Sequence, residues 1–205
     1  MELKEINFLE ECLKLISKGE KPDKVKNKFE KSVIKKSGLL SLKPKIFVCN
    51  VDENSLTNGN EYSDICKKKF AEENVIVVCA DIEDQIMNLQ EKDRKDFMDE
   101  AGIKNTGLDN LIRTGYNALG LSTFFTSGPE ESRAWTIEKN ANAAEAAGVI
   151  HTDFKKKFIR AETVSHDDFV KYKGFNECKN AGKLRLEGKD YIVKDGDVML
   201  FRTGA

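Results

Sequence analysis

The chain has 205 residues, of which 40% are hydrophobic and 34% charged, a balance typical of a folded globular protein. No apolar run approaches the roughly 20 residues that a spanning helix needs, so we expect no membrane segment and no membrane partner. The charged, helix-patterned N-terminus is not that of a signal peptide.

The formal net charge of -1 hides three blocks of different sign. Residues 1–45 carry 12 basic and 7 acidic side chains, residues 46–120 carry 8 and 15, and residues 121–205 carry 14 and 13. This pattern predicts at least three segments with different surfaces. No block is basic enough to indicate nucleic-acid binding by charge alone, and we expect no DNA sequence specificity.

The five cysteines form no Cys-x-x-Cys pair, and their number is odd. A disulfide framework or a zinc site is therefore not expected, and reduced thiols in a cytoplasmic protein are the simplest interpretation.

The first segment, residues 1–37, reads as a helical hairpin. Leu3, Ile6, Leu9, Leu13 and Ile16 recur at spacings of three and four, which predicts an amphipathic helix over residues 2–17. Gly19 and Pro22 end it, and a second helix is predicted over residues 23–36. There are too few heptads for a free-standing coiled coil.

The second segment, residues 38–120, alternates strands and helices. Residues 45–49 and 74–79 are short apolar runs that predict buried strands. Helices are predicted over residues 62–73, 83–101 and 106–120, the first of them ending at Glu73. This alternation is typical of an α/β layer with parallel strands.

The third segment, residues 121–205, has short strands and short helices in an α+β pattern. Strands are predicted over residues 133–137 and 158–163, with a capping box at Asn142 and a second, Asp-containing one at Ser165. The Asp195-Gly196 pair predicts a closing hairpin over residues 191–199. The pattern is compatible with a β-grasp (ubiquitin-like) fold.

A possible ligand edge follows the first predicted strand. Asn50, Val51 and Glu53 come directly after it, and Cys79 and Ala80 follow the next strand. Because ligands of α/β sheets bind at the carboxyl ends of strands, these five residues are candidates for ligand contact. The family resemblance described below implies that the ligand is a nucleotide base. The alternative for Asn50 and Glu53 is a turn with a helix cap, and the alternative for Cys79 and Ala80 is tight packing.

These blocks together resemble the YchF/Obg-like ATPase family of translation-factor-related P-loop NTPases. The resemblance rests on residues 133–137, 150–154, 158–163 and 191–199, and on the Asn50-x-x-Glu53 variant of a GTPase Asn-Lys-x-Asp motif. It implies part of a P-loop NTPase sheet over residues 38–120, a remnant of the helical insertion domain over 1–37 and a TGS domain over 121–205. It also implies binding of ATP or GTP and association with the ribosome.

The phosphate-binding half of such a site is missing from the sequence. No Gly-x-x-x-x-Gly-Lys-[Ser/Thr] motif occurs, nor an Asp-x-x-Gly strand end suited to Mg²⁺. Mg²⁺ is therefore expected only in an intact family member, and these 205 residues are not expected to hydrolyse nucleotide unaided. The resemblance predicts a fragment, a split reading frame or a shortened paralogue.

Lys155, Lys156, Lys157 and Arg160 form the best basic cluster and are candidates for RNA or ribosome contact. Lys171, Lys173, Lys183, Arg185 and Lys189 could extend it; the alternative is a solvated face. Trp135, Phe154 and Phe158 are expected to be core residues rather than base-stacking platforms. His151 and His166 are expected to be structural.

Two functions remain open. The first is the C-terminal portion of a YchF-like ATP/GTP-binding protein that associates with the ribosome. The second is a non-enzymatic module that docks on the ribosome or RNA. An unrelated α/β protein is the third, least favoured possibility.

Overall fold

The structure is a computed structural model that describes residues 3–70 and 74–204. The contacts between residues divide the chain into two compact units, and the boundary along the chain lies between Phe47 and Val48. Within the described ranges, no helix is both long enough and apolar enough to cross a membrane. The predicted helix end at Glu73 lies outside these ranges.

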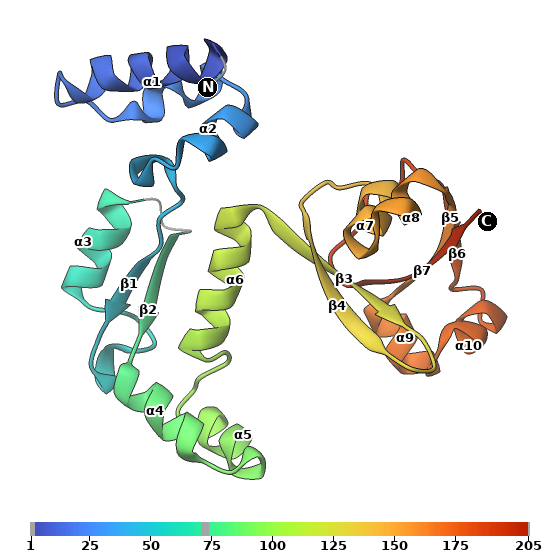
Figure 1. Ribbon diagram of the computed structural model, residues 1–205. Helices are drawn as coiled ribbons and strands as arrows, with labels where there is room; N and C mark the ends of the chain where they lie inside the picture. Colours follow the sequence, from blue (N-terminus) through green and yellow to red (C-terminus); the bar gives the residue numbers. More distant parts are fainter. Residues whose placement is uncertain (1–2, 71–73, 205) are drawn as a thin grey trace. The chain divides into compact units, whose positions relative to one another are not determined.

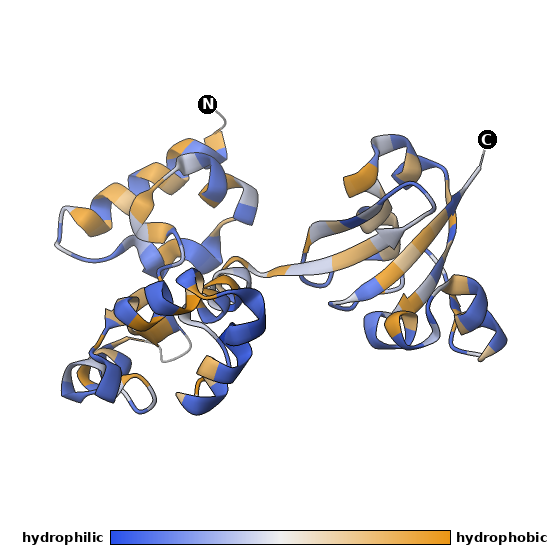
Figure 2. Cartoon of the chain, turned by 90° about the horizontal axis from the view of Figure 1, so that it is seen from below, coloured by the Kyte–Doolittle hydropathy of each residue, from blue (hydrophilic) through white to orange (hydrophobic). Residues whose placement is uncertain are grey.

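The first unit is helical and has a core of its own (Figure 1). It contains α1 (Leu3–Ile16), the 3-10 helix η1 (Pro22–Lys28), α2 (Lys31–Ser37) and the 3-10 helix η2 (Leu40–Leu42). The buried core is formed by Phe8, Cys12, Val25, Val33 and Leu42. Figure 2 shows hydrophobic and hydrophilic residues alternating along α1, as an amphipathic helix requires.

α1 confirms the first predicted helix, but a different face is buried. Leu3, Leu13 and Ile16 are at least half exposed, whereas Phe8 and Cys12 are buried. The ring of Phe8 packs edge-on against Phe29 with centroids 5.0 Å apart. The buried face of α1 is therefore the one that carries the large ring of Phe8, and not the one that carries the most aliphatic side chains.

The predicted second helix over residues 23–36 is interrupted. Phe29 and Glu30 adopt extended conformations between η1 and α2, and this break places the Phe29 ring against Phe8. Helical spacing in the sequence continues across the break, so periodicity alone could not reveal it.

The second unit begins with a mixed α/β region. Its elements are β1 (Phe47–Asn50), the 3-10 helix η3 (Glu53–Ser55), α3 (Glu61–Lys69), β2 (Val75–Val78), α4 (Ala80–Asn88), α5 (Glu91–Glu100) and α6 (Gly107–Leu119). β1 and β2 pair in a two-stranded sheet, and both run in the same direction in Figure 1. Val75 and Ile76 of β2 are buried as predicted, but Val48 of β1 is 51% exposed, because few described residues cover that strand.

The single helix predicted over residues 83–101 is wrong, because the chain forms α4 and α5 instead. Leu89 and Gln90 are extended between them. Arg94 of α5 donates hydrogen bonds from Nε to the Leu89 carbonyl at 3.1 Å and from Nη2 to the Met87 carbonyl at 3.1 Å. These bonds satisfy carbonyl groups at the end of α4 and so stabilise the break.

The rest of the second unit is built on a five-stranded sheet with the order β4-β3-β7-β5-β6. β7 runs parallel to β3 and antiparallel to β5. The elements are β3 (Leu121–Ser127), β4 (Ser132–Glu138), α7 (Ala143–Ile150), α8 (Thr152–Lys156), β5 (Phe158–Ser165), α9 (His166–Tyr172), α10 (Phe175–Asn180), β6 (Arg185–Glu187) and β7 (Asp197–Thr203). Figure 1 shows this sheet and its helices at the right.

The core of this sheet forms where α7 packs on it. Its buried residues are Phe124, Ile137, Ala143, Ala146, Ala161, Val193 and Met199, with Trp135 and Phe158 packed against them. Trp135 and Phe158 are thus core-facing, as expected. Ala143 and Ala146 are fully buried, and such small side chains let a helix approach a sheet closely. The predicted capping box of Asn142 and Glu145 is present at the start of α7.

The predicted hairpin over residues 191–199 is wrong. The Asp197 amide donates to the Lys194 carbonyl at 3.1 Å, and of the two central residues only Gly196 has a positive φ, 83°. This is the pattern of a type II turn, whereas two-residue hairpins favour primed turns. Ile192 instead bridges Asn142, and β7 continues between β3 and β5.

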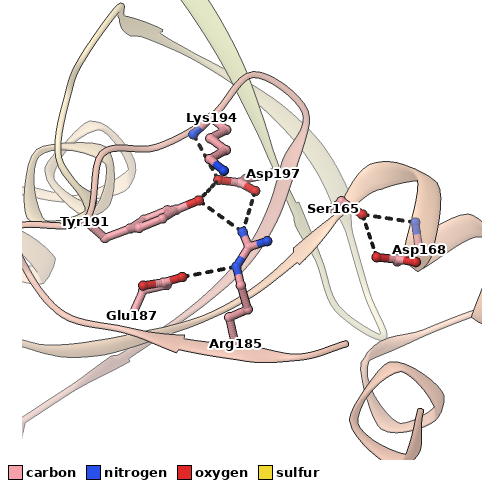
Figure 3. Close-up of polar contacts among 7 residues, drawn as sticks. All are labelled: Ser165, Asp168, Arg185, Glu187, Tyr191, Lys194 and Asp197. Carbon is pink, nitrogen blue, oxygen red and sulfur yellow. Dashed lines mark hydrogen bonds and ion pairs between the residues drawn. The ribbon is translucent and has the colours of Figure 1, made fainter. Parts of the chain in front are cut away.

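A buried carboxylate anchors that turn. Asp197 is 2% exposed and accepts hydrogen bonds from the Tyr191 hydroxyl at 2.7 Å, Arg185 Nη2 at 3.1 Å and the Lys194 amide at 2.9 Å (Figure 3). Arg185 Nε also donates to Glu187 at 3.1 Å. We call Arg185, Glu187, Tyr191 and Asp197 the Asp197 network; it ties β6 and the turn to β7.

A neighbouring pair begins α9. Ser165 Oγ accepts from the Asp168 amide at 3.2 Å and donates to Asp168 Oδ2 at 3.0 Å (Figure 3). The predicted cap is therefore present, although Asp168 contacts the Ser165 hydroxyl rather than its backbone amide as in a standard capping box.

Replacing Asp197 with Ala should strongly destabilise the protein. The change leaves Arg185 and Tyr191 without their buried acceptor. We expect a loss of about 3 kcal/mol, the low end for breaking a buried ion pair, because the Arg185 side chain is 40% exposed. Urea unfolding of Asp197→Ala, with exposed Asp190→Ala as control, measures this; equal midpoints for the two variants would contradict the network's role.

Tyr191 should make stability depend on alkaline pH. Burial, and then the hydrogen bond to Asp197, raise the pKa of Tyr191 to about 12. An unfolded tyrosine titrates near about pH 10, so the neutral hydroxyl contributes stability in full below about pH 10 and loses it between about pH 10 and 12. The stability difference between the wild-type protein and Tyr191→Phe should shrink across that window in urea unfolding. Tyr172→Phe is the control, and a constant Tyr191→Phe difference would contradict the assignment.

Candidate functional site

The ends of β1 and β2 are joined by a side chain. Asn50 Oδ1 accepts a hydrogen bond from the Ala80 amide at 3.0 Å, and the Val51 amide donates to the Val78 carbonyl at 2.8 Å. The structure therefore brings Asn50, Val51, Cys79 and Ala80 together, although they come from two segments of the chain.

These four residues face different surroundings. Val51 is 8% exposed and Cys79 is 1% exposed, so their side chains contribute to packing and not to an open surface. Asn50 and Ala80 are exposed. We call Asn50, Glu53 and Ala80 the strand-end edge.

Glu53 lies beside this edge in η3 and is exposed. Its Oε1 lies 3.4 Å from Nε2 of Gln85 in α4. The neighbouring Asp52 caps η3, since its Oδ1 accepts from the Ser55 amide at 3.0 Å. The sequence analysis considered a helix cap as the alternative role of Asn50 and Glu53. In the structure the cap of η3 is Asp52, and the Glu53 carboxylate does not take part in it.

Sequence reasoning missed three residues near the strand-end edge, namely Gln85, Glu83 and Gly107. Glu83 Oε1 accepts from the Gly107 amide at 2.5 Å, which attaches the start of α6 to α4. A Cβ on Gly107 would lie 2.8 Å from Val78 Cγ1, so a larger residue would disturb the end of β2. The Thr106 and Asp109 capping box could have located the helix start, but nothing local points to Glu83.

Among residues 3–70 and 74–204, no three His, Cys, Asp or Glu side chains lie close enough together to hold a metal ion.

The basic cluster lies in the part of the chain that is built on the five-stranded sheet. Lys155 and Lys156 end α8, Lys157 follows, and Arg160 is on β5; all four are exposed. Lys156 Nζ lies 3.9 Å from Asp153, a loose pair. The stem of Lys155 covers Gly148, because a Cβ there would lie 3.1 Å from Lys155 Cβ. We call Lys155, Lys156, Lys157 and Arg160 the basic surface.

Two further arginines, Arg202 and Arg185, bear on how far the basic surface extends. Arg202 of β7 is paired in register with Arg160, and its Nε donates to Glu162 at 2.9 Å. This hydrogen bond lowers the pKa of Glu162. Arg185, one of the residues that could extend the cluster, has its guanidinium held by Glu187 and Asp197, and its side chain is 40% exposed.

The two histidines lie in structural positions. His151 Nδ1 accepts from the Asp153 amide at 3.2 Å and caps α8. The His166 ring lies 5.6 Å from the Phe125 ring.

Comparison with known proteins identifies relatives along most of the chain. Residues 121–204 match the family described as YchF-GTPase_C, protein of unknown function (DUF933). The chain is 49% identical over 178 residues to the "Ribosome-binding ATPase YchF" of Haemophilus ducreyi, covering 86% of this chain and 49% of that protein. It is 50% identical over 174 residues to the protein of that name from Escherichia coli O157:H7, covering 84% and 48%.

A solved structure is similar as well. The Schizosaccharomyces pombe YchF GTPase aligns with a TM-score of 0.68 and 35% identity, over 83% of this chain and 46% of that one. The chain spans about half the length of the curated relatives it matches. Residues 121–204 thus match the C-terminal domain of the YchF family, and the chain is similar to YchF proteins in sequence and structure along most of its length.

Proposed function

We propose that this chain supplies the base-recognition edge and a ribosome-contact module of a YchF-type nucleotide-binding protein that acts in the cytoplasm. The observation that carries the proposal is the hydrogen bond between the Ala80 amide and Asn50, which assembles an exposed strand-end edge beside Glu53. The relatives' name, ribosome-binding ATPase, supports both halves of the proposal.

The chemistry of the edge favours adenine. Guanine presents two adjacent N–H donors, which a short Asp in the family motif accepts together. Glu53 is longer by one methylene, and Gln85 is close enough to hold one of its oxygens. One carboxylate oxygen then remains to accept from a single amino group, such as that of adenine. We infer that ATP or ADP binds better than GTP or GDP, with Val51 and Cys79 buttressing the edge from inside.

We further propose the finer fold assignments. Residues 121–205 form a TGS domain of β-grasp type, which the sheet order β4-β3-β7-β5-β6 and its parallel central pair support. Residues 38–120 correspond to the later part of a P-loop NTPase domain, and residues 1–37 to part of its helical insertion.

Glu53→Ala should weaken adenine-nucleotide binding. Losing a hydrogen bond to a charged group costs about 1.5–3 kcal/mol, so affinity for ADP should fall by at least about tenfold. Calorimetric titration of the full chain with ADP and GDP measures this, and Glu61→Ala, an exposed carboxylate on α3, is the control. The absence of binding at millimolar ADP, or equal affinities for the two variants, would contradict the base edge.

A second candidate function is a non-enzymatic module that docks on the ribosome or RNA. It is favoured by the basic surface, whose four side chains are exposed at the end of α8 and on β5, in a part of the chain with its own core. Lys and Arg contacts to phosphate would supply the affinity, in the way common to RNA-binding surfaces. In this function the strand-end edge is only a scaffold.

Changing Lys155, Lys156 and Lys157 together to Glu should weaken ribosome co-sedimentation. Each lost phosphate contact should lower the slope of log affinity against log salt by about 0.7–0.9, so the slope should fall by about 2–3. The matched control changes the other lysine run, Lys67, Lys68 and Lys69, to Glu. Unchanged co-sedimentation of the first variant would rule out the basic surface as the docking site.

A further inference from the structure

β4 forms one edge of the five-stranded sheet, where its neighbour is β3 (Figure 1). The strand runs over seven residues, Ser132–Glu138, contains no proline, and keeps one register against β3 along its whole length. A long, regular edge strand offers a row of backbone donors and acceptors to another strand.

Two hydrogen bonds show which backbone groups of β4 point away from β3. The Lys139 amide donates to the Gly120 carbonyl at 2.7 Å, and at the other end the Gly128 amide donates to the Glu131 carbonyl at 2.9 Å. Because bonded residues alternate along an antiparallel ladder, the odd-numbered residues of β4 bond to β3. The even-numbered residues therefore point their amides and carbonyls outward, and all of them are exposed: Ser132, Ala134, Thr136 and Glu138.

The charges at the two ends of this edge fit a second copy of the same strand. If two copies of β4 pair antiparallel with Trp135 at a two-fold axis, Glu131 of each copy lies opposite Lys139 of the other copy, and both side chains are exposed. Lys139 Nζ donates to Asn117 Oδ1 at 2.9 Å, which leaves it further hydrogens for a carboxylate. Opposite charges that face each other across two strands stabilise the pairing.

The same charges disfavour the neighbouring registers. With the axis moved to Ala134, Glu130 would lie opposite Glu138 of the other copy. With the axis moved to Thr136, Arg133 would lie opposite Lys139. Like charges directly opposite destabilise a strand pair, so the edge is self-complementary in the register centred on Trp135.

We propose that two copies of the chain associate through β4, which pairs antiparallel with β4 of the other copy about an axis at Trp135. The backbone groups of Ala134 bond to those of Thr136 of the other copy, and two sheets become one continuous sheet. The contact is of the isologous kind, in which the same surface is used by both copies.

Trp135 lies at the centre of this contact. Its ring stacks on Phe124 with centroids 6.5 Å apart, and its Nε1 donates to Thr126 Oγ1 at 2.9 Å. The Arg133 guanidinium lies 4.2 Å from the ring centroid. Because Trp135 bonds to β3, the two Trp135 residues of a dimer form a non-hydrogen-bonded pair, in which side chains are closest. Pairing should therefore cover more of each partly exposed indole.

The test is analytical ultracentrifugation of the full chain over a range of concentrations. A single edge strand gives a small interface, so we expect a weak dimer in the micromolar range. Trp135 is the single tryptophan of the sequence, and its emission should shift to the red on dilution as the dimer separates. A chain that remains monomeric up to roughly 0.5 mM, or a dimer whose emission does not change on dilution, would overturn the proposal.

Ala134→Pro tests the outward backbone groups. The change removes an amide that points away from β3, and edge strands tolerate proline at such positions, so the ladder to β3 should remain. Dimer affinity should fall at least about tenfold, because each copy loses a donor to the other. Urea unfolding checks that the variant is folded, and a folded variant that dimerises like the wild-type protein contradicts the pairing.

A charge exchange tests the register and does not depend on the proline. Glu131→Lys should weaken the dimer about tenfold, because two exposed charge pairs per dimer become repulsive, and the double variant with Lys139→Glu should restore it. Glu130→Lys is the matched control, since it changes the charge equally but faces Asn140 in this register. Equal weakening by the two single variants, or a double variant that stays monomeric, would rule out the register.

Discussion

The hydrogen bond from the Ala80 amide to the Asn50 side chain is the constraint on which the candidate site depends. It satisfies a backbone donor at the start of α4 and fixes where the chain turns after both strands. Glu53 then lies within reach of Gln85, and Glu83 of the same helix binds the start of α6. A single amide contact thereby aligns two loops and two helices around one exposed edge.

The five-stranded sheet depends on a different kind of contact. Asp197 is a buried charge, and it is tolerated because a hydroxyl, a guanidinium and a backbone amide all donate to it. These donors hold the turn that sends β7 between β3 and β5, so the central parallel pair forms. The same network holds the Arg185 guanidinium against Glu187 and Asp197.

Structural features that depend on residues close in the sequence were predicted well. Features that depend on contacts between distant residues were not. The Asn142 capping box, the strand over residues 158–163 and the two short strands over residues 45–49 and 74–79 all depend on neighbours within a few positions. Each is present, with the short strands observed as Phe47–Asn50 and Val75–Val78. The breaks at Phe29 and Leu89 depend on partners elsewhere, namely the Phe8 ring and the Arg94 side chain, which periodicity does not report. The turn at Gly196 failed as a hairpin for the same reason, since Asp197 bonds to residues of β6 and of the preceding loop.

The same distinction applies to the candidate site. The sequence placed Asn50 and Ala80 at the ends of two neighbouring strands, and the structure brings them together, because strands and helices that alternate bring strand ends together. Gln85 and Glu83 needed the fold, since each joins segments that are distant in sequence.

The most direct test of the base-recognition edge is an NMR titration of the full, isotope-labelled chain with ADP. The account predicts amide shifts that saturate together at Glu53, Ala80 and the Gln85 side chain, with residues 155–157 unaffected. Shifts confined to the basic surface, or none up to millimolar ADP, would contradict it and leave the strand-end edge as a structural junction.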